Sequence, residues 1–211
     1  MHLDHLSFAA GPEGLVGTSD RLGELLGVSF HDGGFHPRFG TRNRILPLAD
    51  GQYLEVVAVL DHPAADKAPF GQAVRARSAT GGGWLGWVVA VDDLAPVEER
   101  IGRPAVNGSR YLPNGTRLEW QQIGVKGLQA DPQLPFFVRW LSPPSYHPSV
   151  GGKAVELLMI EIAGDPERVD DWLGGGADKI LHDVEIVWVA PNGEPGLVAA
   201  TFSTPRGEVR I

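Results

Sequence analysis

The sequence predicts an α+β fold made of repeated β-α-β-β-β modules. The main observation is that a strand, a helix and further strands recur about three times along the 211 residues, roughly 70 to 80 residues apart. A hydrophobic content of 43% and a charged content of 21% are ordinary for a globular protein. The 28 glycines and 17 prolines indicate frequent turns and short helices.

The composition also excludes several classes of function. A formal net charge of -8 argues against nucleic-acid binding, which needs a basic surface. No apolar run approaches the ~18 to 20 residues of a membrane span, and the N-terminus lacks the features of a signal peptide. The absence of cysteine rules out disulfides and thiolate chemistry. We therefore expect a cytoplasmic protein that binds neither nucleic acid nor membrane.

The first predicted module spans residues 1–62. It begins with an alternating strand that places Leu3 and His5 on one face, and its helix ends at Gly27. Asp50 and the glycine after it supply the turn of a hairpin. In chain order we expect a strand at 2–9, a helix at 15–26, a strand at 28–31, a turn at 32–34 and hairpin strands at 42–48 and 52–60.

Two further modules are predicted after a linker. Residues 63–82 are interpreted as the linker, because prolines, small residues and three consecutive glycines do not support a buried element. The second module spans 83–145 and the third, an extra one, spans 153–211. Their expected elements are strands at 84–91, 116–125, 136–141, 155–163, 185–189, 197–203 and 208–211, and helices at 94–101 and 165–173.

Four segments of the chain carry a resemblance to a known family: LDHLSFAA, GTRNRILPLADGQYLEVVAV, PFFVRWLSPPSYHPS and GLVAATFSTPRGEVRI. They resemble the glyoxalase-like domain proteins of the vicinal-oxygen-chelate superfamily. The resemblance implies that the first two modules pair and that their strands curve into a half-open mixed β-barrel with flanking helices around a cleft. Several members of that superfamily hold a divalent metal there, with a His on the first strand and a Glu on the last strand of a module.

His5 and Glu55 fall on these two family positions, and they are the candidate catalytic residues and metal ligands. A neutral imidazole can bind a metal or act as a base near neutral pH. A carboxylate inside an apolar strand needs a cation, a metal or an open cleft beside it. The alternatives are a histidine that is only hydrogen-bonded in a polar cleft and a glutamate paired with Arg42 or Arg44.

The second module departs from the family pattern. Trp87 stands where a second histidine ligand is expected, and Val138 stands where a second glutamate is expected. A third ligand therefore has to come from elsewhere. His147 can reach the cleft from the end of the second module, whereas His36 is interpreted as a surface loop residue.

The resulting ligand set is small and leaves open coordination positions, as catalysis needs. It consists of His5, Glu55 and His147 around a divalent ion such as Zn, Mn, Ni or Fe.

Four side chains are predicted to contact a substrate. Asn43 offers a polar contact, and Arg42 can hold a carboxylate in a bidentate way, although solvent or Asp50 is the simpler partner for this arginine. Trp87 and Trp140 belong to an aromatic-rich second module and would give the cleft an apolar wall.

The sequence thus favours a glyoxalase-like small-molecule enzyme of lyase or isomerase type. In this hypothesis a metal or the His5 and Glu55 pair polarises an oxygen-bearing apolar substrate and moves a proton. The alternative is a non-catalytic small-molecule-binding or resistance-type protein with a degenerate metal site. Because three modules leave one unpaired, we expect either a homodimer or a third module that packs on the barrel.

Overall fold

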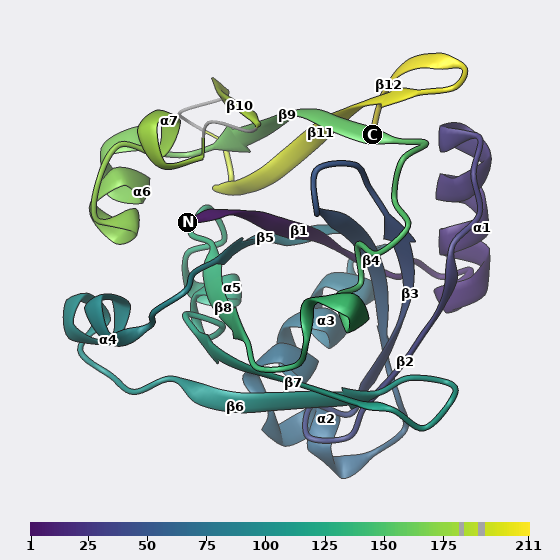
Figure 1. The fold of residues 1–211 in the computed structure, drawn as a ribbon, viewed down its shortest axis with the longest axis horizontal. Helices are drawn as coiled ribbons and strands as arrows, with labels where there is room; N and C mark the ends of the chain where they lie inside the picture. Colours follow the sequence, from purple (N-terminus) through teal and green to yellow (C-terminus); the bar gives the residue numbers. More distant parts are fainter. Residues whose placement is uncertain (182–183, 190–192) are drawn as a thin grey trace.

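Eight strands of the computed structural model form a closed barrel in the order β1-β4-β3-β2-β6-β7-β8-β5. Four more strands form a second sheet in the order β10-β9-β11-β12, which lies over β1 and β5 in Figure 1. The structure describes residues 1–181, 184–189 and 193–211. The predicted α+β fold, with a mixed β-barrel and flanking helices, is confirmed, but the barrel is closed rather than half-open, because β2 pairs with β6 and β1 pairs with β5.

The first half of the barrel follows the predicted order of elements. Helix α1 ends at Gly27, which has a φ of 72° and caps the helix in the left-handed conformation. The hairpin turns at Asp50 and Gly51, whose φ angles are 57° and 77°. The elements are β1 (His2–Ala9), α1 (Gly14–Leu26), β2 (His31–His36), β3 (Thr41–Pro47) and β4 (Tyr53–Val59).

Strand β2 differs from the sequence prediction of a strand at 28–31 and a turn at 32–34. The two glycines expected to form a turn lie inside the strand. Gly34 has a φ of 98°, and a Cβ at this position would lie 1.8 Å from the carbonyl oxygen of Tyr111. Glycine is required there because β2 passes close to β6, and the pairing of Phe35 with Tyr111 closes the barrel.

The segment interpreted as a linker forms two helices, α2 (Pro63–Lys67) and α3 (Pro69–Ala79). The prediction that this segment contains no buried element is therefore wrong. The prolines stand in the first turn of each helix, where they favour helix initiation. Phe70 and Val74 are buried, and small residues allow α3 to pack closely against β4 and β5. Figure 1 shows α3 behind the ring of strands.

The second half of the barrel repeats the sheet order of the first half. Strands β5, β8, β7 and β6 are neighbours in that order, as β1, β4, β3 and β2 are. Strand β6 is an addition to the prediction. The elements are β5 (Gly83–Ala90), α4 (Ala95–Ile101), β6 (Val106–Tyr111), β7 (Arg117–Ile123), α5 (Gly127–Ala130), β8 (Phe136–Trp140) and a 3-10 helix (Pro144–Tyr146).

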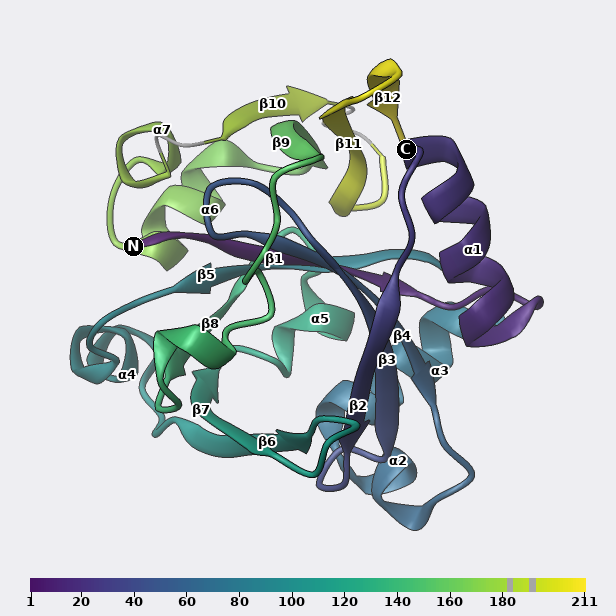
Figure 2. The same ribbon diagram turned by 45° about the vertical axis from the view of Figure 1, so that its right-hand side comes forward.

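The strands and the first helix of the C-terminal part follow the predicted order along the chain. The sheet order differs from that of the two barrel halves, because β9 lies between β10 and β11 instead of at an edge. Its elements are β9 (Glu156–Ala163), α6 (Pro166–Leu173), α7 (Ala177–Ile180), β10 (Glu185–Val189), β11 (Gly196–Thr204) and β12 (Gly207–Arg210). Figure 2 shows this sheet from a second side, above β1 and β5. Within the described ranges, no helix is long and apolar enough to cross a membrane.

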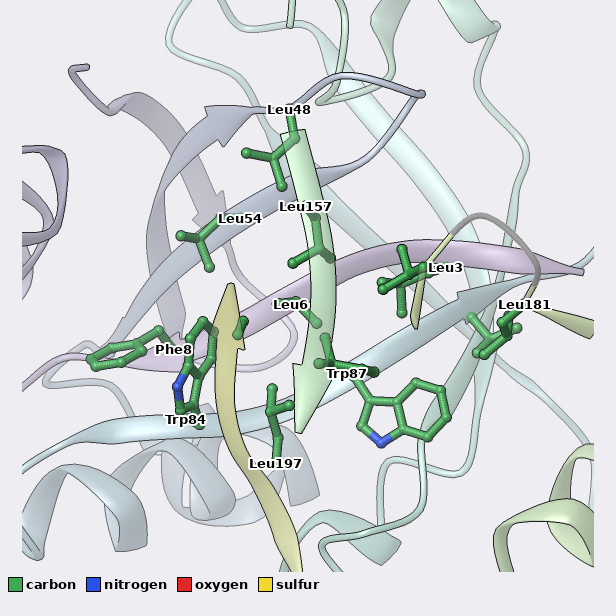
Figure 3. Close-up of a cluster of buried hydrophobic side chains, with 14 of the residues drawn as sticks. Leu3, Leu6, Phe8, Leu48, Leu54, Trp84, Trp87, Leu157, Leu181 and Leu197 are labelled. Atoms are coloured by element: carbon green, nitrogen blue, oxygen red, sulfur yellow. The ribbon is translucent and has the colours of Figure 1, made fainter. Parts of the chain in front are cut away.

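The second sheet packs directly on the barrel, which is one of the two arrangements expected for the third module. A continuous core joins Leu3, Leu6 and Trp87 of the barrel to Leu157 and Leu197 of the sheet. Figure 3 shows these side chains between β1, β5, β9 and β11. The outer face of β1 is therefore buried, and its inner face is left to form the site.

Candidate functional site

Strand β1 carries a bulge at Asp4. Leu3 pairs with Val89 and His5 pairs with Val88, so Asp4 is an extra residue in this strand. The predicted alternation that placed Leu3 on the same face as His5 is therefore wrong. Leu3 lies in the core beneath the second sheet, whereas His5 lines the interior of the barrel.

The buried carboxylate of Asp4 connects three side chains. Its Oδ1 lies 2.5 Å from Nδ1 of His5, and its Oδ2 lies 3.1 Å from Nε2 of His147. Trp140 Nε1 donates a hydrogen bond of 2.9 Å to the same Oδ2. Burial alone would raise the pKa of Asp4, but the hydrogen bonds from His147 and His5 outweigh it and hold the pKa well below its usual range.

The ionised state of Asp4 determines which imidazole nitrogens carry protons. An ionised carboxylate only accepts hydrogen bonds, so Nδ1 of His5 and Nε2 of His147 must both donate to it. A neutral His5 then carries its free lone pair on Nε2. This is the nitrogen that lies 3.9 Å from Oε1 of Glu55.

Glu55 is held by two hydrogen bonds from neighbouring strands. Ser7 Oγ donates to Oε1 at 2.6 Å, and Asn43 Nδ2 donates to Oε2 at 2.7 Å. Burial would raise the pKa of Glu55, but the charges of His5 and His36 and these two hydrogen bonds lower it overall. A carboxylate at Glu55 therefore faces His5 at neutral pH.

Arg110 on β6 completes this polar network and was missed by the sequence analysis. It is 3% exposed, and its Nη1 donates to Oδ1 of Asn43 at 3.1 Å. Gly33 makes room for it, because a Cβ at that position would lie 2.8 Å from Nη1. The Pro113-Asn114-Gly115 turn was the available signal, since a strand before this turn is the natural hairpin partner of β7.

These groups line a cavity inside the barrel. His36, expected on a surface loop, is 5% exposed and lines this cavity from the end of β2. Burial lowers its pKa to about 4. His5 stacks on Tyr53 with ring centroids 4.3 Å apart. The remaining walls are largely aromatic and include Phe39, Phe70, Trp120, Phe136 and Trp140.

The structure brings four of the predicted site residues into this cavity, namely His5, Asn43, Glu55 and Trp140. Arg42 points outward from β3 instead, with Nη2 3.3 Å from Asp32 and its guanidinium over the ring of Phe35. Trp87 is fully buried in the core under the second sheet and donates to the carbonyl oxygen of Gln133. Neither side chain lines the cavity.

The donor set does not fit the predicted metal site. Asp4 stands between His147 and His5, so the three ligands expected from the sequence do not converge. Both oxygens of Glu55 already accept hydrogen bonds. In the part of the chain that the structure describes, no group of three or more His, Asp or Glu side chains could hold a metal ion.

The second half of the barrel supplies apolar residues at the positions equivalent to the first half-site. Val138 is equivalent to Glu55, as the sequence alignment of the modules indicated, but Val88 rather than Trp87 is equivalent to His5. The pairs that establish this are His5–Tyr53 and Ser7–Glu55 in the first half, and Val88–Phe136 and Ala90–Val138 in the second. Trp87 points to the opposite face because it is one residue out of this register.

Comparison with known proteins agrees with this architecture. A family model described as a glyoxalase-like domain matches residues 3–175. The chain belongs to the glyoxalase-like domain family. This confirms the resemblance found in the sequence. No curated protein matches the chain.

Solved structures resemble this glyoxalase-like protein in fold. A hypothetical protein from Staphylococcus aureus has a TM-score of 0.60 at 15% identity, covering 100% of this chain and 85% of that one. A methylmalonyl-CoA epimerase variant from Streptomyces coelicolor, in complex with 2-nitronate-propionyl-CoA, has a TM-score of 0.41 at 15% identity, with 67% and 99% coverage. A mutant of 4-hydroxymandelate synthase from Streptomyces coelicolor has a TM-score of 0.45 at 12% identity, with 99% and 61% coverage.

Proposed function

We propose that this protein is a small-molecule enzyme of lyase or isomerase type that moves a proton on an oxygen-bearing substrate in the barrel cavity. The observation that carries the proposal is the contact of Asp4 with Nδ1 of His5, which leaves Nε2 of His5 as the basic nitrogen beside the cavity. Membership of a family with the same barrel supports it.

In this proposal His5 is the general base. Nε2 removes a proton from a substrate carbon next to a carbonyl group, and the carbon–hydrogen electron pair moves toward the carbonyl oxygen. The carboxylates of Asp4 and Glu55 stabilise the imidazolium that forms, since they lie 2.5 Å and 3.9 Å from its two nitrogens. His5 then returns the proton to the substrate.

Tyr53 is the proposed donor to the substrate oxygen. Burial raises its pKa well above the usual value, with a further contribution from the charges of Asp4 and Glu55. Its hydroxyl therefore stays protonated and can stabilise the charge that develops on the oxygen. The aromatic walls keep water away from this charge.

A metal-dependent form of the proposal would use His5 and Glu55 as ligands of a divalent ion, as in several members of the superfamily. Two protein ligands are too few for tight binding. Metal analysis by mass spectrometry of untagged protein, purified without chelator, tests this form beside His5→Ala. Near-stoichiometric metal that is lost in the variant would favour it, whereas a protein that stays empty after incubation with manganese, zinc, nickel and iron would contradict it.

Hydrogen exchange with heavy water tests the proton transfer itself. A panel of carbonyl compounds with exchangeable α-hydrogens is incubated with the protein in D2O and followed by proton NMR. We expect exchange with the wild type and loss of exchange in His5→Gln and in Glu55→Gln. His2→Gln, which changes an exposed histidine on the same strand, is the control. Exchange that is unchanged in His5→Gln would overturn the proposal.

A non-catalytic binding protein is the second candidate. The observation that favours it is the pair Val88 and Val138 at the positions of a second half-site. In that case ligand affinity survives His5→Ala and falls when a cavity aromatic such as Trp120 is truncated.

The proposed setting in either case is the cytoplasm, which the lack of cysteine supports. A homodimer, the other arrangement expected from the sequence, remains a proposal that light scattering tests, and a mass near 22.6 kDa would contradict it.

A further inference from the structure

Arg110 places a buried positive charge in the wall of the cavity. It is 3% exposed, and the charges of Glu55 and Asp32 act on it, but the hydrogen bond of its Nη1 goes to the neutral amide of Asn43. Glu55, the nearest acidic group of the network, is separated from it by Asn43. A buried charge is costly unless an anion accompanies it, so this site is suited to an anionic ligand.

One donor of the guanidinium is also unpaired. Asn43 takes only Nη1, and Nε is buried without a hydrogen-bond partner among the described residues. Nε and Nη2 together form the planar side of an arginine that matches the two oxygens of a carboxylate. An anion bound there would satisfy the orphan donor and the charge at the same time.

Beside the polar network of His5, Asn43 and Glu55, the cavity has an extended apolar wall. Phe39, Phe70 and Trp120 face the same space as Arg110, and Phe136 and Val138 continue this wall across the barrel. The chemistry therefore combines one guanidinium group with an aromatic wall.

We infer that the cavity takes a small carboxylic acid with an aromatic or branched apolar body, whose carboxylate binds the Nε and Nη2 edge of Arg110. This inference rests on the proposed function, because it names the substrate class of the same cavity. Arg110 would then hold the carboxylate while the carbon beside the carbonyl group meets Nε2 of His5.

A matched pair of probes separates charge from shape: phenylacetate and phenylacetamide are nearly isosteric, and only the first is charged. Their affinities are measured by titration of the ¹⁵N-labelled protein, followed on the indole signals of Trp120 and Trp140, which line the cavity. Charge-assisted hydrogen bonds predict that the wild type binds phenylacetate roughly 10- to 100-fold more tightly. Equal affinities, or no binding of either probe, would overturn the inference.

Variants of two arginines identify the group responsible. Arg110→Met should remove the preference for phenylacetate and leave the affinity for phenylacetamide unchanged. Arg110→Lys keeps the charge but not the planar edge, so it should retain a reduced preference and remains informative if the methionine variant does not fold. Arg42→Met is the control, because Arg42 also has a buried Nε without a partner but lies outside the cavity.

The two proposals can fail separately, since these titrations do not depend on turnover. If His5→Gln still binds phenylacetate more tightly than phenylacetamide but has lost hydrogen exchange, both the anion site and the proton transfer are supported. A preference that persists in Arg110→Met would assign the anion to another group and would leave the proposed proton transfer intact. Hydrogen exchange that persists in His5→Gln would refute that proton transfer but not the anion site.

Discussion

Asp4 and His5 are neighbours in the chain, yet Oδ1 of Asp4 lies 2.5 Å from Nδ1 of His5. Neighbouring side chains on a regular strand point to opposite faces, so this contact depends on the bulge in β1. The same short strand thus supplies a base for the cavity and the carboxylate that orients it. His147 and Trp140 hold the other oxygen of Asp4 from the opposite end of the chain.

Asp4→Asn should therefore impair catalysis without impairing substrate binding. The amide has a single acceptor oxygen, so it cannot accept from both His5 and His147. We expect a fall in kcat of about 10²- to 10⁴-fold with little change in KM, because Asp4 does not line the cavity. Steady-state hydrogen exchange measures both constants. His147→Gln is the milder comparison, and an unchanged kcat in Asp4→Asn would contradict the role given to the pair.

His36 should make the protein less stable in mild acid. Its pKa is lowered to about 4 by burial, whereas an unfolded histidine titrates near ~6.5. Between these values the unfolded chain binds the proton first, so the free energy of unfolding falls as the pH drops from ~6.5 to ~4 and levels off below. The loss attributable to this group is about 3 kcal/mol at most.

Urea unfolding at about pH 7 and about pH 4.5 measures this loss in the wild type and in His36→Gln. The variant should keep the titration of the carboxylates and lose only the contribution of His36. A wild-type protein and a variant with the same pH dependence would show that His36 does not titrate as its burial requires. Glutamine is chosen because its side chain can also form a hydrogen bond with Thr41, the partner of His36 in the wild type.

Local patterns were enough to predict most elements of the first module, with the exception of β2. The alternation of Tyr53, Glu55 and Val57 places the carboxylate inside the barrel, and the turn at Asp50 sets the register of Asn43 beside it. These features depend on residues close together in the sequence. His5 and Glu55 were identified from the family resemblance, and Asn43 from its place on the hairpin; all three line the cavity.

The features that were missed depend on distant partners. Gly33 and Gly34 have the composition of a turn, but they lie in a strand because Tyr111 and Arg110 approach from β6. The bulge at Asp4 is created by the pairing of β1 with β5, which no local pattern reveals. Arg110 itself lies in a short polar strand that only its hairpin partner identifies.

Trp87 and Trp120 should respond to truncation in opposite ways. Trp87 is fully buried outside the cavity, so Trp87→Ala should cost about 3 to 5 kcal/mol of stability and leave ligand affinity unchanged. Trp120 lines the cavity, so Trp120→Leu should weaken the binding of apolar ligands. Denaturant unfolding and probe titration on both variants test this. Weakened binding in a folded Trp87→Ala would place Trp87 at the site after all.

Restoring the second half-site should convert the cavity into a metal site. Val88 and Val138 occupy the positions equivalent to His5 and Glu55, and the side chain of Val138 already faces the cavity. Val88→His with Val138→Glu therefore supplies two further ligands to the existing pair, which gives the four ligands of a tetrahedral site. We expect near-stoichiometric zinc or nickel after dialysis, measured by mass spectrometry.

Thermal unfolding supplies the control for this double variant. Two polar groups in a buried apolar wall should destabilise the metal-free protein, and a metal that binds only the folded state should restore stability in proportion to its concentration. Each single variant has only three ligands, and in Val138→Glu only one of them is a histidine. Each should therefore bind metal more weakly than the double variant. A folded double variant that stays metal-free and shows no metal-dependent stabilisation would mean that the two halves of the barrel do not bring these four positions together.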